Sequence, residues 1–201
     1  NINYTGTGGG GGTMATSTNL NTRKYILYTN NARTITKIRF YIPIRDGSGT
    51  DTHGNKDSFY AATWLWVTNQ FLAQQDNMYM DIQYWDTSLV TDMSNAFSHH
   101  RKENGEDNNG LNSNFDISTF NFDITKWNTA NVTNMKNMFR GAGAFNQDIK
   151  TTNTYRWTVE KVQDMSFMFK DAIAFNQDIS NWNPSAVTTI ESMFYNAIAF
   201  D

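Results

Sequence analysis

Four aspartates recur at equivalent places of a repeated phrase and are the carboxylates best placed to act together. They are Asp81, Asp123, Asp148 and Asp178. Carboxylates held in one column repel one another unless they are paired, so three roles are open. Each could accept backbone N–H groups of its own turn, the column could bind cations, or two members could form a catalytic pair. A catalytic pair is the least favoured, because nothing gives two of these aspartates different environments.

Histidine is the other residue type suited to chemistry at neutral pH, and the chain has three. His99 and His100 are adjacent in a charged stretch, but a third metal ligand of the right kind is lacking nearby. No histidine, His53 included, lies near a nucleophile motif. The chain has no cysteine, which excludes disulfides, thiolate metal sites and a thiol nucleophile. We therefore expect no enzyme activity, no cofactor and no metal.

These residues belong to a sequence that is repeated several times. The phrase F-N-x-D-I begins at Phe120, returns at Phe145 and Phe175, and opens again at Phe200. A second phrase, V-x-x-M-x-x-M-F-x-x-A, follows in each copy with small variations. The repeats occupy residues 78–201 and divide into 78–119, 120–144, 145–174 and 175–199, with the start of another at 200.

The copies follow one another at a base step of 25 residues, with two insertions. The first step is 17 residues longer and carries extra residues around 99–119. The third step is 5 residues longer, between Ile149 and Trp157. Insertions in a stacked array leave through loops while the core keeps its register, so both should project from the body.

Each copy combines a short β-leaning phrase, D-I-x-x-W, with an apolar face at helical spacing. In one copy that face consists of Val187, Ile190, Met193 and Ala197. One short strand and one helix or helical turn per copy predict an α/β repeat solenoid of the leucine-rich-repeat type. Equivalent side chains would then form ladders about 5 Å apart.

Two further sets of equivalent residues should form such ladders. The amides of the asparagines both donate and accept, and would tie one coil to the backbone of the next. The tryptophans are interpreted as core residues, with stacked sugar-binding platforms as the alternative. The two sets are Asn121, Asn146 and Asn176, and Trp85, Trp127, Trp157 and Trp182.

The segment before the repeats divides into three parts. Residues 1–20 contain a run of five glycines and predict a flexible leader, since no Lys-Ser/Thr follows that would indicate a phosphate-binding loop. Residues 21–56 predict a β-hairpin, with strands near 25–28 and 35–42, followed by a polar loop. Residues 57–77 have apolar residues at a period near 3.6, and a helix there would cap the first coil.

The phrases F-N-Q-D-I-S-x-W and V-T-x-M-x-x-M-F-x-x-A resemble the repeat of BspA-like leucine-rich-repeat surface proteins of bacteria and mycoplasmas. The resemblance covers residues 57–201 and includes W-D-T-S-x-V-T-D-M-S-x-A-F from Trp85 to Phe97. Thr189 and Ile190 depart from it, where the family usually has Asp and Met. The resemblance implies a non-enzymatic, surface-exposed module for adhesion or recognition, with no catalytic residues.

The composition agrees with such a role. A net charge of -3 gives no support for a nucleic-acid partner, and no apolar run is long enough for a membrane span. We expect an extracellular, cell-surface or virion-surface protein that binds a protein or glycan on another surface through its inserted loops. The candidate contacts are His99, His100, Arg101, Lys102, Glu103, Tyr155 and Arg156.

A structural role is the alternative function. The protein would then be a component of a virus particle or an extracellular filament, assembled with neighbouring copies or other subunits. Its contacts would be the solenoid ends and the N-terminal segment. This alternative depends on the last coil, which would expose apolar surface and a strand edge wherever nothing covers it.

Overall fold

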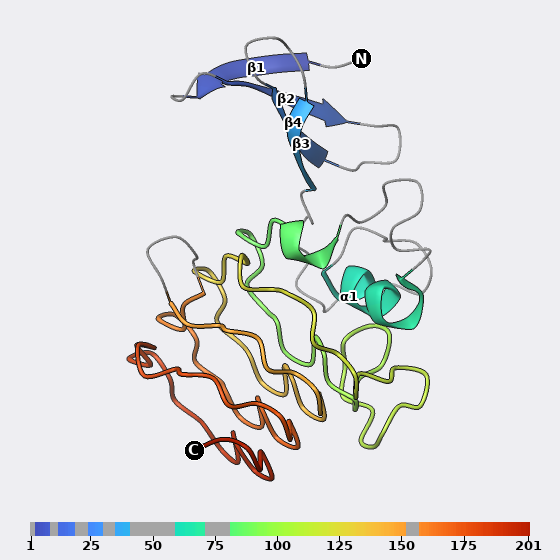
Figure 1. The fold of residues 1–201 in the computed structure, drawn as a ribbon, viewed down its shortest axis with the longest axis vertical. Coiled ribbons are helices and arrows are strands. Elements are labelled where there is room, and N and C mark those ends of the chain that lie inside the picture. The colour runs from blue at the N-terminus through green and yellow to red at the C-terminus, as the bar shows by residue number, and fades with distance from the viewer. Residues whose placement is uncertain are drawn as a thin grey trace.

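The computed structural model describes residues 3–8, 12–18, 24–29, 35–40, 59–70, 81–151 and 157–201. The elements are β1 (Asn3–Gly8), β2 (Gly12–Thr18), β3 (Lys24–Thr29), β4 (Ile35–Phe40), α1 (Phe59–Thr68) and the short 3-10 helix η2 (Ile82–Tyr84). Beyond η2 the chain winds in successive coils that lie one over another, with α1 beside the first of them (Figure 1).

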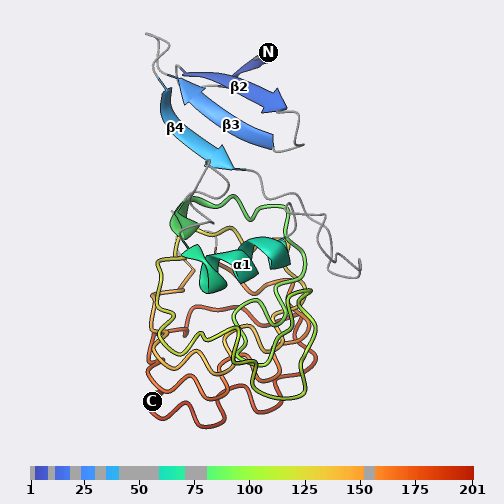
Figure 2. The same cartoon turned by 90° about the vertical axis from the view of Figure 1, so that its right-hand side faces the viewer.

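The N-terminal strands form one antiparallel sheet in the order β1-β2-β3-β4 (Figure 2). β3 and β4 lie in the two stretches expected to form a hairpin. β1 and β2 lie where a flexible leader was expected, which corrects that expectation for their residues. The physical reason is that β2 pairs with β1 on one side and with β3 on the other. This pairing provides hydrogen-bond partners for its backbone N–H and C=O groups, whichever side chains the strand carries. The polar loop expected after the hairpin lies outside the described residues.

The apolar phrase of each copy forms overlapping turns where a helix was expected. In the second copy the N–H groups of Met138, Arg140 and Ala142 donate to the C=O three residues earlier, at 3.0–3.1 Å. An α-helix requires bonds to the C=O four residues earlier. Asn137 and Gly141 also have positive φ, at 56° and 80°, which no helix accommodates. The D-I-x-x-W phrase likewise forms turns, or η2 in the first copy, and not the expected strand.

Neighbouring coils are joined by a backbone ladder that runs in one direction. Four alternate N–H groups of the second copy donate to four C=O groups of the third, at 2.8–2.9 Å. The donors are residues 135, 137, 139 and 141, and the acceptors are residues 164, 166, 168 and 170. The same register joins the first copy to the second and the third to the fourth. Along this stretch, each coil therefore points N–H groups at the next coil and C=O groups at the preceding one.

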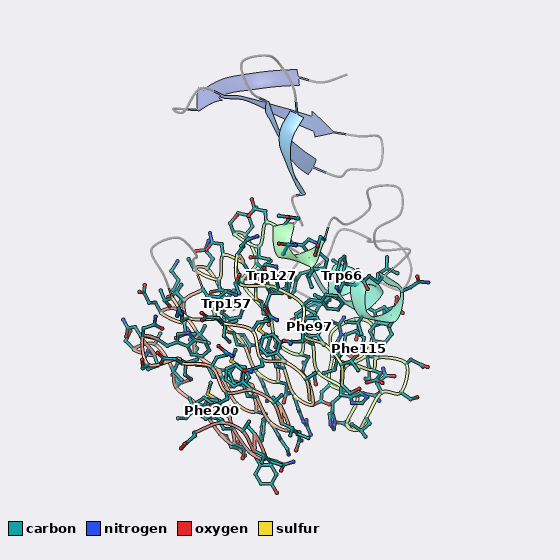
Figure 3. The ribbon with its side chains drawn as sticks, viewed as in Figure 1. Trp66, Phe97, Phe115, Trp127, Trp157 and Phe200 are labelled. Atoms are coloured by element: carbon teal, nitrogen blue, oxygen red, sulfur yellow. The ribbon has the colours of Figure 1, made fainter. Side chains whose placement is uncertain are left out.

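Two columns of phenylalanines fill the interior beside the ladder, and Figure 3 labels one member of each, Phe97 and Phe200. Successive ring centroids are 5.5–6.1 Å apart along each column, and the two rings of one layer are 4.0–4.1 Å apart. This spacing fits offset stacking of rings carried by adjacent chain segments. The columns are Phe97, Phe139, Phe169 and Phe194, and Phe120, Phe145, Phe175 and Phe200.

Candidate functional site

The carboxylate of each repeated aspartate accepts a backbone N–H of its own turn. The carboxylate of Asp123 accepts the N–H of Thr125, and that of Asp178 accepts the N–H of Ser180, both at 2.9 Å. Bonds from the Ser180 hydroxyl and backbone lower the pKa of the Asp178 carboxyl. Asp81 and Asp148 make the same contact in their copies. Within the described ranges no three acidic or histidine side chains are grouped to hold a metal ion.

The repeated asparagines link one coil to the next. The Oδ1 of Asn121 accepts the backbone N–H of Asn146, and the Oδ1 of Asn146 accepts that of Asn176, each at 2.9 Å. Gln147 and Gln177 donate to the same asparagines from the neighbouring position. These side chains therefore act as structural links between copies.

The repeated tryptophans lie in the interior. The rings of Trp127 and Trp157 are fully buried, and Trp85 stacks on Trp127 at 5.9 Å. Their indole N–H groups donate to the backbone C=O of Ile82 and Ile124 in the preceding copy, at 2.8 Å. Trp182, which is partly buried, donates in the same way to the preceding copy. The buried rings of Trp127 and Trp157 are packed against protein and offer no face for a sugar.

The insertion loop, residues 99–119, is the largest departure from the repeat and folds back toward α1. Its Phe115 and Ile117 are fully buried, and the ring of Phe115 stacks on Trp64 of α1 at 4.9 Å. The expectation of a purely projecting loop is therefore wrong for this part. The reason is that the insertion carries apolar residues of its own, and burying Phe115 against α1 and Ile117 in the core is favourable.

Arg101 is also fully buried, which removes it from the candidate partner contacts. All five of its N–H donors are bonded, and none of the acceptors is a carboxylate. The shortest bonds, at 2.7 Å, reach the C=O of Tyr60, the hydroxyl of Thr63 and the C=O of Ala96. The other two reach the C=O groups of residues 102 and 103. One guanidinium thus joins α1, the first coil and the insertion loop.

Aromatic rings surround the same guanidinium. The carbon Cζ of Arg101 lies 4.7 Å from the ring centroid of Phe115 and 5.5 Å from those of Tyr60 and Trp64. Burial lowers the pKa of Arg101 to about 9, so the group remains charged at neutral pH. Burial and the nearby Asp92 carboxylate raise the pKa of the Tyr60 phenol. The site holds a desolvated cation by carbonyl groups and ring faces.

The remaining part of the insertion loop is exposed and held in one shape. The N–H of Asn112 donates to the C=O of His99, and its Nδ2 donates to the C=O of Arg101, at 2.8 and 2.7 Å. Gly105, with φ of 86°, lies against the ring of Tyr60, where any Cβ would clash. The solvent-facing surface of the loop is formed by a few side chains. One of them is Leu111, which is 68% exposed. The exposed members of the loop include Lys102, Glu103, Glu106, Asn109, Leu111, Ser113 and Asn114.

The other candidate partner contacts differ from one another in solvent exposure. His99 and His100 are half-buried, and burial followed by the charge of Arg140 lowers the pKa of the His100 imidazole. Tyr155 and Arg156 lie outside the described residues. Of the candidate contacts that the structure describes, Lys102 and Glu103 are therefore the exposed ones.

A second asparagine column is buried, and the sequence analysis missed it. The Nδ2 of Asn95 donates to the C=O of Gly105, and the Nδ2 of Asn137 donates to the Oδ1 of Asn95, both at 3.0 Å. The Oδ1 of Asn137, which is 2% exposed, has no hydrogen-bond partner in the described part of the chain. The third copy has Phe167 at this position, with φ of 58°. The phrase M-x-N, which is shared by the first two copies (Met93 to Asn95 and Met135 to Asn137), was the available signal, since asparagine tolerates positive φ.

Replacing Phe167 with asparagine is expected to raise the free energy of unfolding by about 1 kcal/mol. The change supplies a donor for the unpaired Oδ1 of Asn137 and relieves the left-handed backbone of a bulky residue, at the loss of some ring packing. Urea unfolding measures the difference. Phe167→Ala is the control, because it keeps the strain and supplies no donor, so it should lower stability. A loss of stability in both variants would contradict this account.

Comparison with known proteins places most of the repeats in one family. Residues 66–156 and residues 108–201 each match the family described as Mycoplasma protein of unknown function, DUF285. The two matches overlap and together span more than half of the chain. No curated protein and no solved structure matches. Within the described residues, no helix combines the length and apolar character required to cross a membrane.

Proposed function

The chain belongs to the family described as Mycoplasma protein of unknown function, DUF285, and from this premise we propose that it is a non-enzymatic recognition module. Residues 78–201 would be a repeat solenoid of the leucine-rich-repeat type, displayed on a cell or virion surface. The solenoid would serve as a rigid scaffold, and the insertion loop would contact a protein partner. The observation that carries the proposal is the anchoring of an exposed, polar loop by the buried Arg101.

The anchoring matters because binding by a loop costs the entropy of ordering it. Here the backbone is already fixed by Arg101, Asn112 and Gly105, so side chains such as Leu111 are presented in a constant arrangement. A solvent-exposed leucine among charged and amide side chains is suited to the small apolar centre of a protein interface. A protein partner is favoured over a glycan because the repeated tryptophan rings of the first three copies are buried.

Surface plasmon resonance against immobilised extracellular-matrix proteins and a glycan array tests the proposal. We expect saturable binding to a protein on the panel, and we expect the double variant Lys102→Ala/Leu111→Ser to weaken it about tenfold or more. Both residues are exposed, so the midpoint of thermal unfolding should be unchanged. Deletion of 101–113 is not a clean test, since it removes the Arg101 anchor.

Lys136→Ala is the matched control, because Lys136 is also exposed but lies in the second copy, outside the insertion loop. It should leave binding unchanged. Binding to glycans alone, binding that the double variant does not weaken, or no binding to any member of the panel would contradict the assignment.

The structural alternative is a subunit of a virion or filament that assembles by head-to-tail stacking of copies. Head-to-tail stacking of copies, however, requires an open first coil, and α1 packs on that coil through contacts such as Trp66 on Trp85, at 5.8 Å. Recognition is therefore the function that these contacts favour.

A further inference from the structure

The insertion loop contains two Asn-Gly pairs, Asn104-Gly105 and Asn109-Gly110. In such a pair the backbone nitrogen of the glycine directly follows the asparagine, and the glycine has no Cβ that would obstruct contact with the asparagine side chain. This nitrogen can therefore attack the carbonyl carbon of the side-chain amide, provided that the peptide unit can rotate toward it. Because the two pairs are identical in sequence, any difference in their reactivity comes from the fold.

The first pair is held in place by several hydrogen bonds. The N–H of Gly105 donates to the C=O of Lys102, and the C=O of Gly105 accepts from the Nδ2 of Asn95, each at 3.0 Å. The Oδ1 of Asn104 accepts the N–H of Glu106 at 3.1 Å. A side-chain hydrogen bond with Asn104 also lowers the pKa of the Glu106 carboxyl. Rotation of this peptide unit would break the two bonds of Gly105, so the fold opposes the attack on Asn104.

The second pair lacks these restraints. Asn109 is exposed, and its backbone N–H donates to the Oδ1 of Asp107 at 2.8 Å. Among the residues whose positions the structure gives, neither the Asn109 side chain nor the N–H of Gly110 has a hydrogen-bond partner, and a Cβ on Gly110 would meet no atom within 4 Å. The peptide unit of Gly110 can therefore rotate toward the Asn109 side chain without breaking a hydrogen bond of its N–H.

We propose that Asn109 is a site of spontaneous deamidation, whereas the fold protects Asn104 from the same reaction. The backbone nitrogen of Gly110 attacks the side-chain Cγ of Asn109 and loses its proton, and the Cγ–Nδ2 bond breaks to release ammonia. The product of this step is a cyclic succinimide. Water then opens the ring at one of its two carbonyl carbons and leaves either aspartate or isoaspartate. The amide and one water thus give the acid and one ammonia, with no oxidant or reductant.

The conversion changes the exposed surface of the insertion loop. It adds one negative charge, which takes the formal net charge from -3 to -4, and isoaspartate also lengthens the backbone by one methylene before Gly110. Gly105 and Asn112 are bonded to other parts of the protein on either side, so the change is confined to the tip of the loop. The modification does not depend on the recognition function proposed above, but it would alter the surface beside Leu111 that this function uses.

The test is incubation of the folded polypeptide of residues 1–201 in warm, mildly alkaline buffer, followed by peptide mapping with mass spectrometry. We expect Asn109 to convert about tenfold or more faster than Asn104, because conversion of Asn104 requires local opening of the loop. Isoaspartate should be among the products. In concentrated urea the two asparagines should convert at similar rates, since the bonds of Gly105 are then absent. Equal rates in the folded chain, or slower conversion of Asn109 than of Asn104, would overturn the proposal.

Gly110→Ala is the matched variant, because its methyl group would enter open space and the φ of Gly110 is not left-handed. The methyl group hinders ring closure, so residue 109 should convert several-fold more slowly while the loop keeps its shape. Asn109→Gln should not convert measurably, since its longer side chain places the carbonyl carbon one bond farther from the attacking nitrogen. Conversion of Asn109 at an unchanged rate in Gly110→Ala would indicate direct hydrolysis of the amide and contradict the proposed ring closure.

Discussion

Replacing Arg101 with methionine is expected to lower the free energy of unfolding by about 3 kcal/mol or more. Methionine fills much of the volume, but it leaves the C=O of Ala96 buried without a donor and takes one of its donors from the C=O of Tyr60, to which the Thr63 hydroxyl also donates. Each such group costs about 1–3 kcal/mol. Contacts of the cation with three aromatic rings are lost as well. Thermal and urea unfolding measure the difference.

Arg101→Lys separates charge from geometry in the same experiment. Lysine keeps the positive charge but has a compact ammonium that cannot reach five acceptors spread over α1, the first coil and the loop. It should therefore recover only a minor part of the loss. Lys102→Met is the control, since that side chain is exposed and should change stability by less than about 0.5 kcal/mol. Equal stability of Arg101→Met and Lys102→Met would show that Arg101 does not hold these elements together.

The sequence was informative about which residues are equivalent. A tryptophan or asparagine that recurs at the same place of every copy must meet the same surroundings, so its contacts recur too. The bonds from Trp127 and Trp157 to the preceding copy, and those between Asn121 and Asn146, follow this rule. Sequence identity between copies therefore predicts side-chain columns without any knowledge of secondary structure.

The backbone conformation was harder to predict, because two conformations bury the same residues. The spacing of the apolar residues in the second copy, Met135, Met138, Phe139 and Ala142, fits a helix. It also fits a series of turns that begin every second residue, each with an N–H bonded to the C=O three residues earlier. The left-handed positions distinguish them, and Asn137 marks one in the second copy. In the third copy Phe167 occupies this position and hides the signal, since a bulky residue rarely adopts positive φ.

The role of Arg101 could not be predicted from its position. An arginine between histidine and lysine in a polar insertion is typical of an exposed loop. Its burial follows from Phe115 and Ile117, which are apolar and lie later in the same insertion. Phe115 attaches the loop to Trp64 of α1, and the guanidinium then donates to buried carbonyl groups such as that of Ala96.

The central claim is that successive coils are joined by alternate N–H groups that all point toward the next coil. In the second copy, alternate amides are bonded to the third copy and most of the others to their own turns. Among residues 190–197 of the last copy, backbone bonds are made only by the N–H groups of residues 193, 195 and 197, within their own turns. Otherwise equivalent amides should thus differ greatly in their rates of exchange with solvent.

Amide hydrogen exchange of a polypeptide of residues 1–201, followed by NMR, measures this difference directly. The amides of residues 135, 137, 139 and 141 should exchange about 1,000-fold or more slowly than those of an unstructured peptide, since their opening requires separation of coils. The amides of residues 190, 192, 194 and 196 should exchange at nearly the unstructured rate. Comparable, unbroken protection of residues 190–197 and 135–142 would indicate a helix in every copy and would contradict the one-directional ladder.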